Sequence, residues 1–163
     1  MNQQIKTHRS ARLMVVDPQG QLLLFRYYDE HQAPYWTTVG GELLEGEDYP
    51  STAMRELKEE TGLTCPIGPL LRERDDIDAV AGSPPARWLE RYFLVRCPPM
   101  AEIATAQWSD EEPSTVHARH WWTREEMREA DPALFKPRWI PELLDDILSS
   151  EPVTKVAEVN LLK

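Results

Sequence analysis

The chain has 163 residues, 41% of them hydrophobic, and a formal net charge of −10 at pH 7. This length predicts a single domain over residues 1–163 with a core of its own. The acidic balance argues against nucleic acid and anionic membranes as partners. A cytoplasmic protein is expected, because the two cysteines lack metal-ligand spacing, the N-terminus is polar, and no apolar run approaches the roughly 20 residues of a membrane helix.

Two strands open the predicted fold. Residues 12–16 are strongly apolar, residues 21–28 resume the apolar pattern, and residues 17–20 between them read DPQG, a turn sequence. A hairpin is therefore expected. Arg26 lies near the end of the second strand, where it either contacts a substrate phosphate or is an ordinary surface arginine.

A third strand, residues 35–39, leads into the glycine pair Gly40 and Gly41. Glycine permits a tight turn and a close approach between backbone and ligand. Trp36 in this strand has two interpretations: it packs in the core, beside the helix that follows, or it stacks on a nucleobase. Core packing is preferred, because aromatic residues in strands usually serve the core.

The residues after the glycine pair predict a short helix. It begins at Asp48, whose side chain can cap free backbone N–H groups, and it ends before Gly62, a residue suited to the left-handed C-cap. At about 100° per residue, Glu56, Glu59 and Glu60 fall within one sector of this helix. The adjoining sector is apolar and suited to a core.

Three neighbouring carboxylates repel one another, and a divalent cation would reverse that repulsion. Hard cations such as Mg²⁺ and Mn²⁺ prefer oxygen ligands. The alternative is a solvated acidic helix face. The glycine pair, the acidic loop and the close-fitting cap favour the cation site. Arg55 is expected to form a bidentate pair with Glu47 that fixes this loop against the helix.

Residues 41–63 resemble the Nudix box, written G-x5-E-x7-R-E-U-x-E-E-x-G-U with U a bulky aliphatic residue. Every specified position is matched at the right spacing, by Gly41, Glu47, Arg55, Glu56, Leu57, Glu59, Glu60, Gly62 and Leu63. Two differences lie outside the pattern. Leu44 stands where many members have glutamate, and Val39 stands where proline is frequent.

The resemblance implies a function and roles for these residues. In the family, the residues that match Glu56, Glu59 and Glu60 hold divalent cations, and the carbonyl of Gly40 or Gly41 joins the metal shell. The implied reaction is hydrolysis of the diphosphate bond in a small nucleoside diphosphate derivative, of the nucleotide or nucleotide-sugar class. Glu59, Glu60 or a glutamate from another loop would act as the base for the attacking water.

Beyond the box, a strand is expected over residues 64–71, a polar loop over 72–87 and a strand over 88–96. Glu90 lies inside the last strand. If it is buried it requires a partner, either the metal cluster or an arginine. The alternative is an edge position that faces water.

The remaining chain predicts an acidic loop, a strand and two helices. Many family members use an additional glutamate from a later loop as metal ligand or general base, and Glu111 and Glu112 are the candidates here. A capping box opens a short helix at Thr123, and residues 141–150 form an amphipathic closing helix. The tail, residues 151–163, is expected to add an edge strand or to mediate self-association in a homodimer.

This order of strands and helices predicts an α/β protein. The resemblance implies a Nudix-type α/β/α sandwich, with a mixed sheet between helices and the box as a loop–helix–loop. Two alternative functions share this fold: isomerisation of a diphosphate, and non-catalytic sensing of a nucleotide ligand. The complete box, the lack of a clear catalytic cysteine motif and the lack of an attached DNA-binding domain favour the hydrolase.

Overall fold

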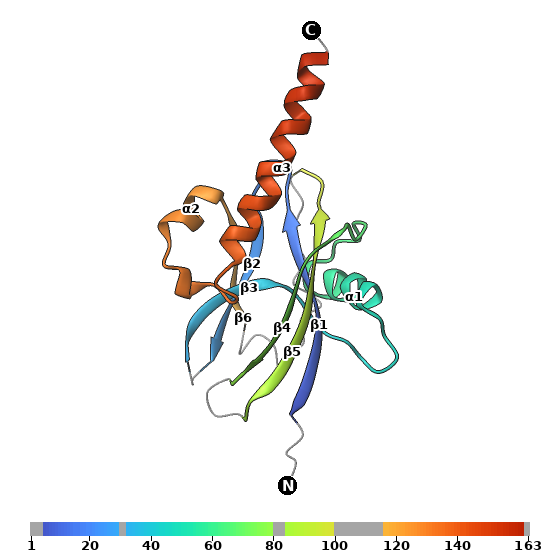
Figure 1. Ribbon diagram of the computed structural model, residues 1–163, viewed down its shortest axis with the longest axis vertical. Coiled ribbons are helices and arrows are strands. Elements are labelled where there is room, and N and C mark those ends of the chain that lie inside the picture. Colours follow the sequence, from blue (N-terminus) through green and yellow to red (C-terminus); the bar gives the residue numbers. More distant parts are fainter. Residues whose placement is uncertain (1–4, 30–31, 80–83, 100–115, 162–163) are drawn as a thin grey trace.

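The computed structural model describes residues 5–29, 32–79, 84–99 and 116–161 (Figure 1). Its strands are β1 (Lys6–Val16), β2 (Leu22–Asp29), β3 (Gln32–Glu42), β4 (Leu70–Asp78), β5 (Ala86–Arg96) and β6 (Val116–Trp122). Its helices are α1 (Tyr49–Thr61), α2 (Arg124–Glu129) and α3 (Ile140–Leu161), with a 3-10 turn, η2 (Pro132–Leu134), between the last two.

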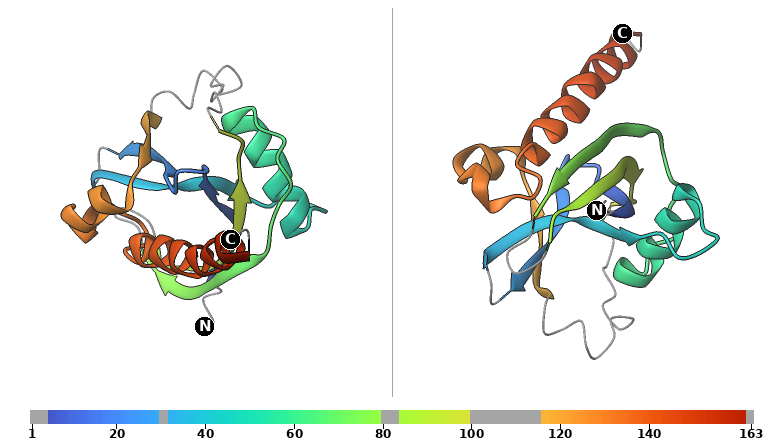
Figure 2. Two further views of the ribbon diagram at one scale, coloured as in Figure 1. Left: turned by 90° about the horizontal axis from the view of Figure 1, so that it is seen from above. Right: turned by 60° about the horizontal axis from the view of Figure 1, so that its bottom comes forward.

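The strands form one mixed sheet between helices. Their order is β4-β5-β1-β3-β2-β6. The pair β1–β5 is parallel, and the other neighbouring pairs are antiparallel. α1 lies on one face of the sheet, and α2 and α3 lie on the other (Figure 2). The predicted α/β/α sandwich with a mixed sheet is therefore confirmed.

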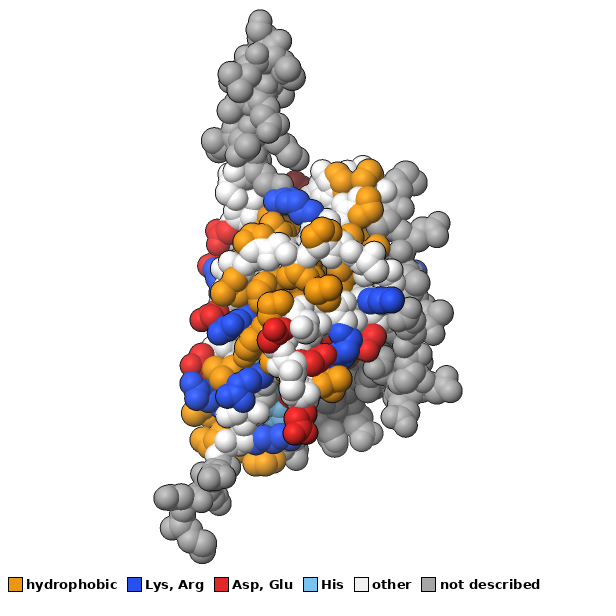
Figure 3. Space-filling view, turned by 90° about the vertical axis from the view of Figure 1, so that its right-hand side faces the viewer, with side chains coloured by type: hydrophobic (Ala, Val, Ile, Leu, Met, Phe, Trp, Pro, Cys, Tyr) orange, Lys and Arg blue, Asp and Glu red, His pale blue; other side chains and the backbone are white. Residues whose placement is uncertain are grey.

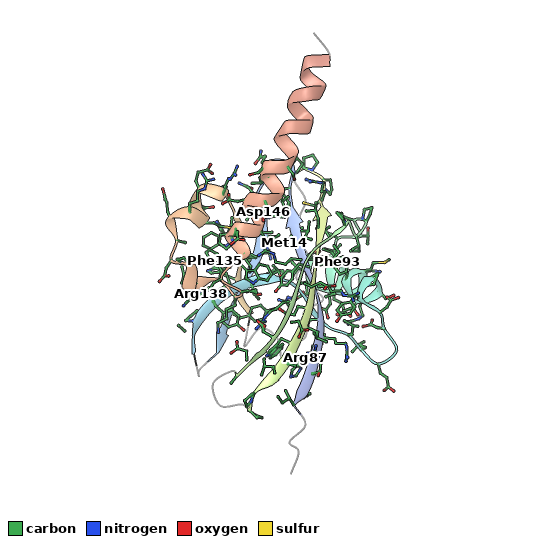
Figure 4. All side chains as sticks on the ribbon, viewed as in Figure 1. Met14, Arg87, Phe93, Phe135, Arg138 and Asp146 are labelled. Carbon is green, nitrogen blue, oxygen red and sulfur yellow. The ribbon has the colours of Figure 1, made fainter. Side chains whose placement is uncertain are left out.

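Each face of the sheet has its own core, because side chains alternate between the two faces along a strand. The core under α1 contains Leu13 of β1 and Leu57 of α1. The core under α3 contains Met14 of β1 and Phe135. Figure 4 shows Phe93 on the α1 side and Phe135 on the side of α2 and α3.

The predicted hairpin of the first two strands is present only at its turn. Asp17 Oδ1 accepts hydrogen bonds from the backbone N–H groups of Gln19 and Gln21, at 3.0 and 2.8 Å. There β1 pairs with β2 at Val16 and Leu22. Beyond the turn, β3 lies between the two strands and pairs with both. The turn chemistry is local, whereas the insertion of β3 depends on residues that come later in the chain.

The predictions of a strand over residues 64–71 and a loop over 72–87 were wrong. Residues 62–69, all of them described, form no regular element, and β4 covers residues 70–78 instead. Pro66 and Pro69 explain part of the shift, because proline cannot donate to a strand ladder.

The charges of β4 concealed it as a strand. Side chains across the β4–β5 pair form ion pairs, with Arg87 Nη2 2.8 Å from Asp75 Oδ2 and Arg91 Nε 3.2 Å from Glu73 Oε1. Opposite charges across neighbouring strands stabilise a sheet. A sequence rich in charge therefore forms an edge strand here.

The prediction of an edge strand in the tail was also wrong. α3 continues to Leu161, and its last turns stand away from the rest of the molecule (Figure 1). Its first half packs on the sheet through Leu143, Leu144 and Ile147, which are 3%, 1% and 4% exposed. Self-association through the tail stays a prediction. No described helix is long and apolar enough to cross a membrane.

The core under α1 generates a stability prediction. Leu57 is 1% exposed, so we expect Leu57→Ala to lower the free energy of unfolding by about 2–5 kcal/mol, through lost burial and the cavity left behind. Met54→Ala is the matched control in the same helix, since Met54 is 62% exposed. Equilibrium urea unfolding measures both. Equal losses in the two variants would contradict the assignment of the buried face of α1.

Candidate active site

α1 begins and ends at the predicted caps. Asp48 has an extended backbone and accepts a hydrogen bond from the Ser51 N–H at 2.8 Å. Gly62 has a φ of 78°, and its N–H donates to the Lys58 carbonyl at 2.9 Å. Glycine adopts this left-handed conformation without strain. The two caps fix which residues of the helix face the core and which face the loop before it.

The predicted pair between Arg55 and Glu47 is present and bidentate. Arg55 Nε donates to Glu47 Oε2 at 2.7 Å, and Nη2 donates to Oε1 at 2.9 Å. Glu47 Oε1 also accepts from the Leu44 N–H and the Thr52 hydroxyl, both at 2.8 Å. Arg55 Nη2 reaches the Glu42 carbonyl as well, at 3.1 Å. These bonds fasten the loop to α1 at both of its ends.

The glycine pair is in direct contact with the glutamates of α1. Gly40 N–H donates to Glu60 Oε1 at 2.7 Å. Gly40 has a φ of 144°, and a Cβ there would lie 2.2 Å from the Ala11 carbonyl oxygen. A Cβ on Gly41 would lie 2.5 Å from Glu56 Oε1. The position of Gly40 therefore requires glycine, and Gly41 leaves the space that the Glu56 carboxylate occupies.

The carboxylates of this cluster share one guanidinium. Arg55 Nη1 donates to Glu56 Oε1 at 2.9 Å and to Glu59 Oε2 at 3.1 Å. The Glu56 side chain is 14% exposed, and that of Glu59 is 49% exposed. Burial raises the pKa of Glu56, and the charge of Arg55 opposes this rise. Acidic and basic side chains lie close together on the side of the molecule that carries α1 (Figure 3).

The donor set suits a hard cation, although it is not arranged as a finished cage. Within the described residues, no group of three acidic, histidine or cysteine side chains is placed to hold a metal ion. Arg55 bonds to both Glu56 and Glu59 in this arrangement. The space left by Gly41 beside the Glu56 carboxylate, and the carboxylate oxygens gathered there, fit Mg²⁺ or Mn²⁺.

Trp36 and Arg26 lie away from these glutamates in the sheet. Trp36 packs against the core under α3, not beside α1, so that part of its prediction was wrong. Its ring meets those of Trp122 and His120 edge-on, with centroids 5.3 and 6.3 Å apart. Arg26 is exposed and lies opposite Trp36 in the β2–β3 ladder. A contact of either residue with substrate stays a prediction.

Glu90 is buried and has an arginine as its partner. It is 8% exposed, and its Oε1 accepts from Arg74 Nη1 at 3.1 Å and from the Tyr92 hydroxyl at 2.9 Å. Of the two alternatives, the buried and paired carboxylate is the observed one. Glu111 and Glu112 lie outside the described residues, so their predicted roles stay predictions.

Arg12 is a candidate that the sequence analysis missed. Its guanidinium donates from Nη2 to the Thr38 carbonyl at 2.7 Å and to Thr37 Oγ1 at 3.1 Å, and from Nε to Thr38 Oγ1 at 3.1 Å. It lies opposite Gly40 in the β1–β3 ladder. The signal in the sequence was an arginine directly before the apolar run LMVV, which a strand does not need.

An open hollow of about 280 Å³ lies beside the loop, lined by residues 6–9, 42–45 and Glu47. The lining contains two basic side chains, Lys6 and Arg9, and three glutamates, Glu42, Glu45 and Glu47. The three carboxylates outnumber these two basic side chains, so the lining of the hollow does not favour a phosphorylated ligand.

Comparisons with known proteins identify the family and the fold. A family model described as the NUDIX domain matches residues 6–143. No curated protein gave a significant match. Among solved structures, the MutT protein of Methanosarcina mazei Go1 has a TM-score of 0.69 at 15% identity, with 92% of this chain and 99% of that chain covered.

Two further structures of similar fold have named substrates. The Escherichia coli dihydroneopterin triphosphate pyrophosphohydrolase has a TM-score of 0.64 at 18% identity, covering 88% of this chain and 97% of that one. The Caenorhabditis elegans Ap4A hydrolase has a TM-score of 0.61 at 18% identity, covering 88% and 98%. At these identities the likeness concerns the fold.

The Arg55–Glu47 pair generates a prediction about pH. The pKa of Glu47 falls from 4.5 to about 2, first through the hydrogen bonds from Arg55 and then through that from the Leu44 backbone. Since the folded-state pKa is the lower one, ionised Glu47 stabilises the fold above about pH 4.5, and this contribution is lost as the pH falls toward 2.

We therefore expect Glu47→Gln to lower the urea midpoint at about pH 7, and the gap to wild type to narrow at about pH 3. Glu45→Gln is the matched control, because Glu45 is an exposed glutamate of the same loop. A gap for Glu47→Gln that stays constant between the two pH values would contradict the role of this charge.

Proposed function

The chain belongs to the NUDIX family, whose members are pyrophosphohydrolases, and from this premise we propose that it hydrolyses the diphosphate bond of a nucleoside diphosphate derivative with Mg²⁺ or Mn²⁺. One observation carries the proposal: the carboxylates of α1 meet the glycine pair, with Glu60 on the Gly40 N–H and Glu56 in the space beside Gly41. Carboxylate oxygens beside bare backbone suit a cation that also binds phosphate.

Glu56, Glu59 and Glu60 would hold the cation, with help from the backbone carbonyl of Gly40 or Gly41. A bound cation would supply charge stabilisation to the phosphate oxygens. Arg55 acts as a positioning residue, because it bonds to Glu56 and Glu59 and, through Glu47, to the loop. Catalysis of this kind depends mostly on placement and charge.

One carboxylate must accept a proton from the attacking water. Glu59 is the most exposed of the three glutamates, so water reaches it most easily. Glu60 already accepts a hydrogen bond from Gly40. We propose that the base is Glu59, Glu60, or a glutamate of the loop that contains Glu111 and Glu112.

The substrate we propose is a small nucleotide or nucleotide sugar, handled in the cytoplasm. The net charge of −10 disfavours a long polynucleotide. Proteins of similar fold include a triphosphate pyrophosphohydrolase and an Ap4A hydrolase. Both names describe compounds with linked phosphates, which supports the same class here.

A substrate panel tests the proposal. Dinucleoside polyphosphates, nucleotide sugars and nucleoside triphosphates are incubated with Mg²⁺ or Mn²⁺, and released nucleotide and phosphate are measured. Hydrolysis at the diphosphate bond supports the proposal, and its loss on chelation supports the cation. Binding without turnover would identify a nucleotide sensor, and rearrangement of an isoprenoid diphosphate without phosphate release would identify an isomerase. Either result would overturn the proposal.

Removing the base generates an activity prediction. On the best substrate of the panel, we expect Glu59→Gln or Glu60→Gln to lower turnover by at least about two orders of magnitude, the usual worth of a general base. The amide keeps the size of the side chain while removing its charge. Glu129→Gln is the control, since Glu129 is an exposed glutamate of α2. Near-native rates in both active-site variants would exclude Glu59 and Glu60 as bases and ligands.

A further inference from the structure

The guanidinium of Arg12 is charged, but all of its hydrogen bonds go to uncharged oxygens. Nε and Nη2 donate to the side chains of Thr37 and Thr38 and to the Thr38 carbonyl. Within the described residues, Nη1 makes no hydrogen bond and no carboxylate forms an ion pair with Arg12. The side chain is half-buried, so a ligand can still reach it.

Other half-buried arginines of the molecule differ in this respect. Arg55 is paired with Glu47, Arg74 with Glu90, and Arg124 with Asp145. Charged groups removed from water are normally paired, because leaving one unpaired is costly. An arginine held only by neutral oxygens therefore retains the capacity to bind an anion.

The backbone of Arg12 lies next to Gly40, which belongs to the proposed cation site. Arg12 lies opposite Gly40 in the β1–β3 ladder, and the Gly40 N–H is bonded to Glu60. Burial lowers the pKa of Arg12, but the negative field of nearby groups, strongest from Glu90 and including Glu60, raises it overall. The guanidinium thus stays charged, and its electrostatic interaction extends to Glu60 and Glu56 of α1.

The threonines also fix the direction of the guanidinium. Thr37 Oγ1 donates onward to the Lys136 carbonyl at 2.8 Å, so it presents a lone pair to Arg12. Thr38 binds Arg12 through both its hydroxyl and its carbonyl. A planar guanidinium held in this way is prepared for a phosphate oxygen, its preferred class of partner.

We propose that Arg12 is a substrate-binding residue that donates hydrogen bonds to a phosphate oxygen of the diphosphate held at the α1 carboxylates. This inference rests on the proposed function, in which the carboxylates of α1 would hold the cation and Arg12 would add a hydrogen bond to the same diphosphate. The competing explanation is structural: Arg12 would only fasten β1 to β3. The two explanations differ in what they predict for cation binding without phosphate.

Calorimetric titration separates them, using methylenediphosphonate, a diphosphate that cannot be hydrolysed, in the presence of Mn²⁺, and Mn²⁺ alone. We expect Arg12→Met to weaken the affinity for methylenediphosphonate about tenfold or more, the worth of a hydrogen bond between charged groups. The affinity for Mn²⁺ alone should stay the same or rise, because a nearby positive charge has been removed. Loss of affinity for both ligands would favour the structural role and overturn the proposal.

Two further variants keep the test decisive if Arg12→Met does not fold, as judged by circular dichroism. Arg12→Lys keeps the charge but not the planar fork, so methylenediphosphonate should bind at least about threefold more weakly, with Mn²⁺ unaffected. Wild-type affinity in Arg12→Lys would overturn the proposal. Arg124→Met is the control for removing a half-buried arginine elsewhere, and it should bind both ligands as wild type does.

The substrate panel and the titrations together distinguish a failure of this inference from a failure of the proposed function. If wild type binds methylenediphosphonate through Arg12 but hydrolyses nothing in the panel, the hydrolase proposal fails and the phosphate contact stands. If wild type hydrolyses a panel substrate and Arg12→Met binds methylenediphosphonate as tightly as wild type, the function stands and the contact is wrong.

Discussion

The bidentate bond between Arg55 and Glu47 is the interaction on which the rest of the site depends. A charge-assisted fork of this kind fixes both distance and angle. It joins a helix to a loop that has no core of its own, and the same guanidinium reaches Glu56, Glu59 and the Glu42 carbonyl. Two of the glutamates that would bind a cation, Glu56 and Glu59, are therefore held by this arginine.

The proposed site also suggests how an acidic protein would bind an anion. The net charge of −10 describes the whole chain, whereas a phosphate responds to the groups within a few ångströms. There the field is set by Arg12, Arg55 and the proposed cation, and a bound cation inverts the local balance.

Features made by residues close together in the sequence were predictable. The caps of α1 span three or four residues, and Arg55 and Glu47 are eight apart, so spacing alone constrains them. The resemblance to the Nudix box covers these same residues, within 41–63. Elements outside that stretch were less well predicted, because only the local sequence pattern was available to predict them.

The missed features depend on residues far apart. Glu90 meets Arg74 across a strand pair, 16 residues away, and Arg12 meets Thr38 across 26. Until the strand order is known, such partners cannot be named. β4 was missed for a related reason: its charges resemble a loop until the compensating charges of β5 are placed opposite them. The face occupied by Trp36 likewise follows from strand register, which one sequence does not specify.

The position of β4 at the border of the sheet has a consequence for how copies of the protein meet. A border strand offers unpaired backbone groups to any strand that approaches, and this is a common route to aggregation. Here the approaching strand would encounter Arg72, Glu73, Arg74, Asp75 and Asp76 in succession. Taking that row of charges out of water is unfavourable, so the charges that disguised this strand also disfavour edge-to-edge association.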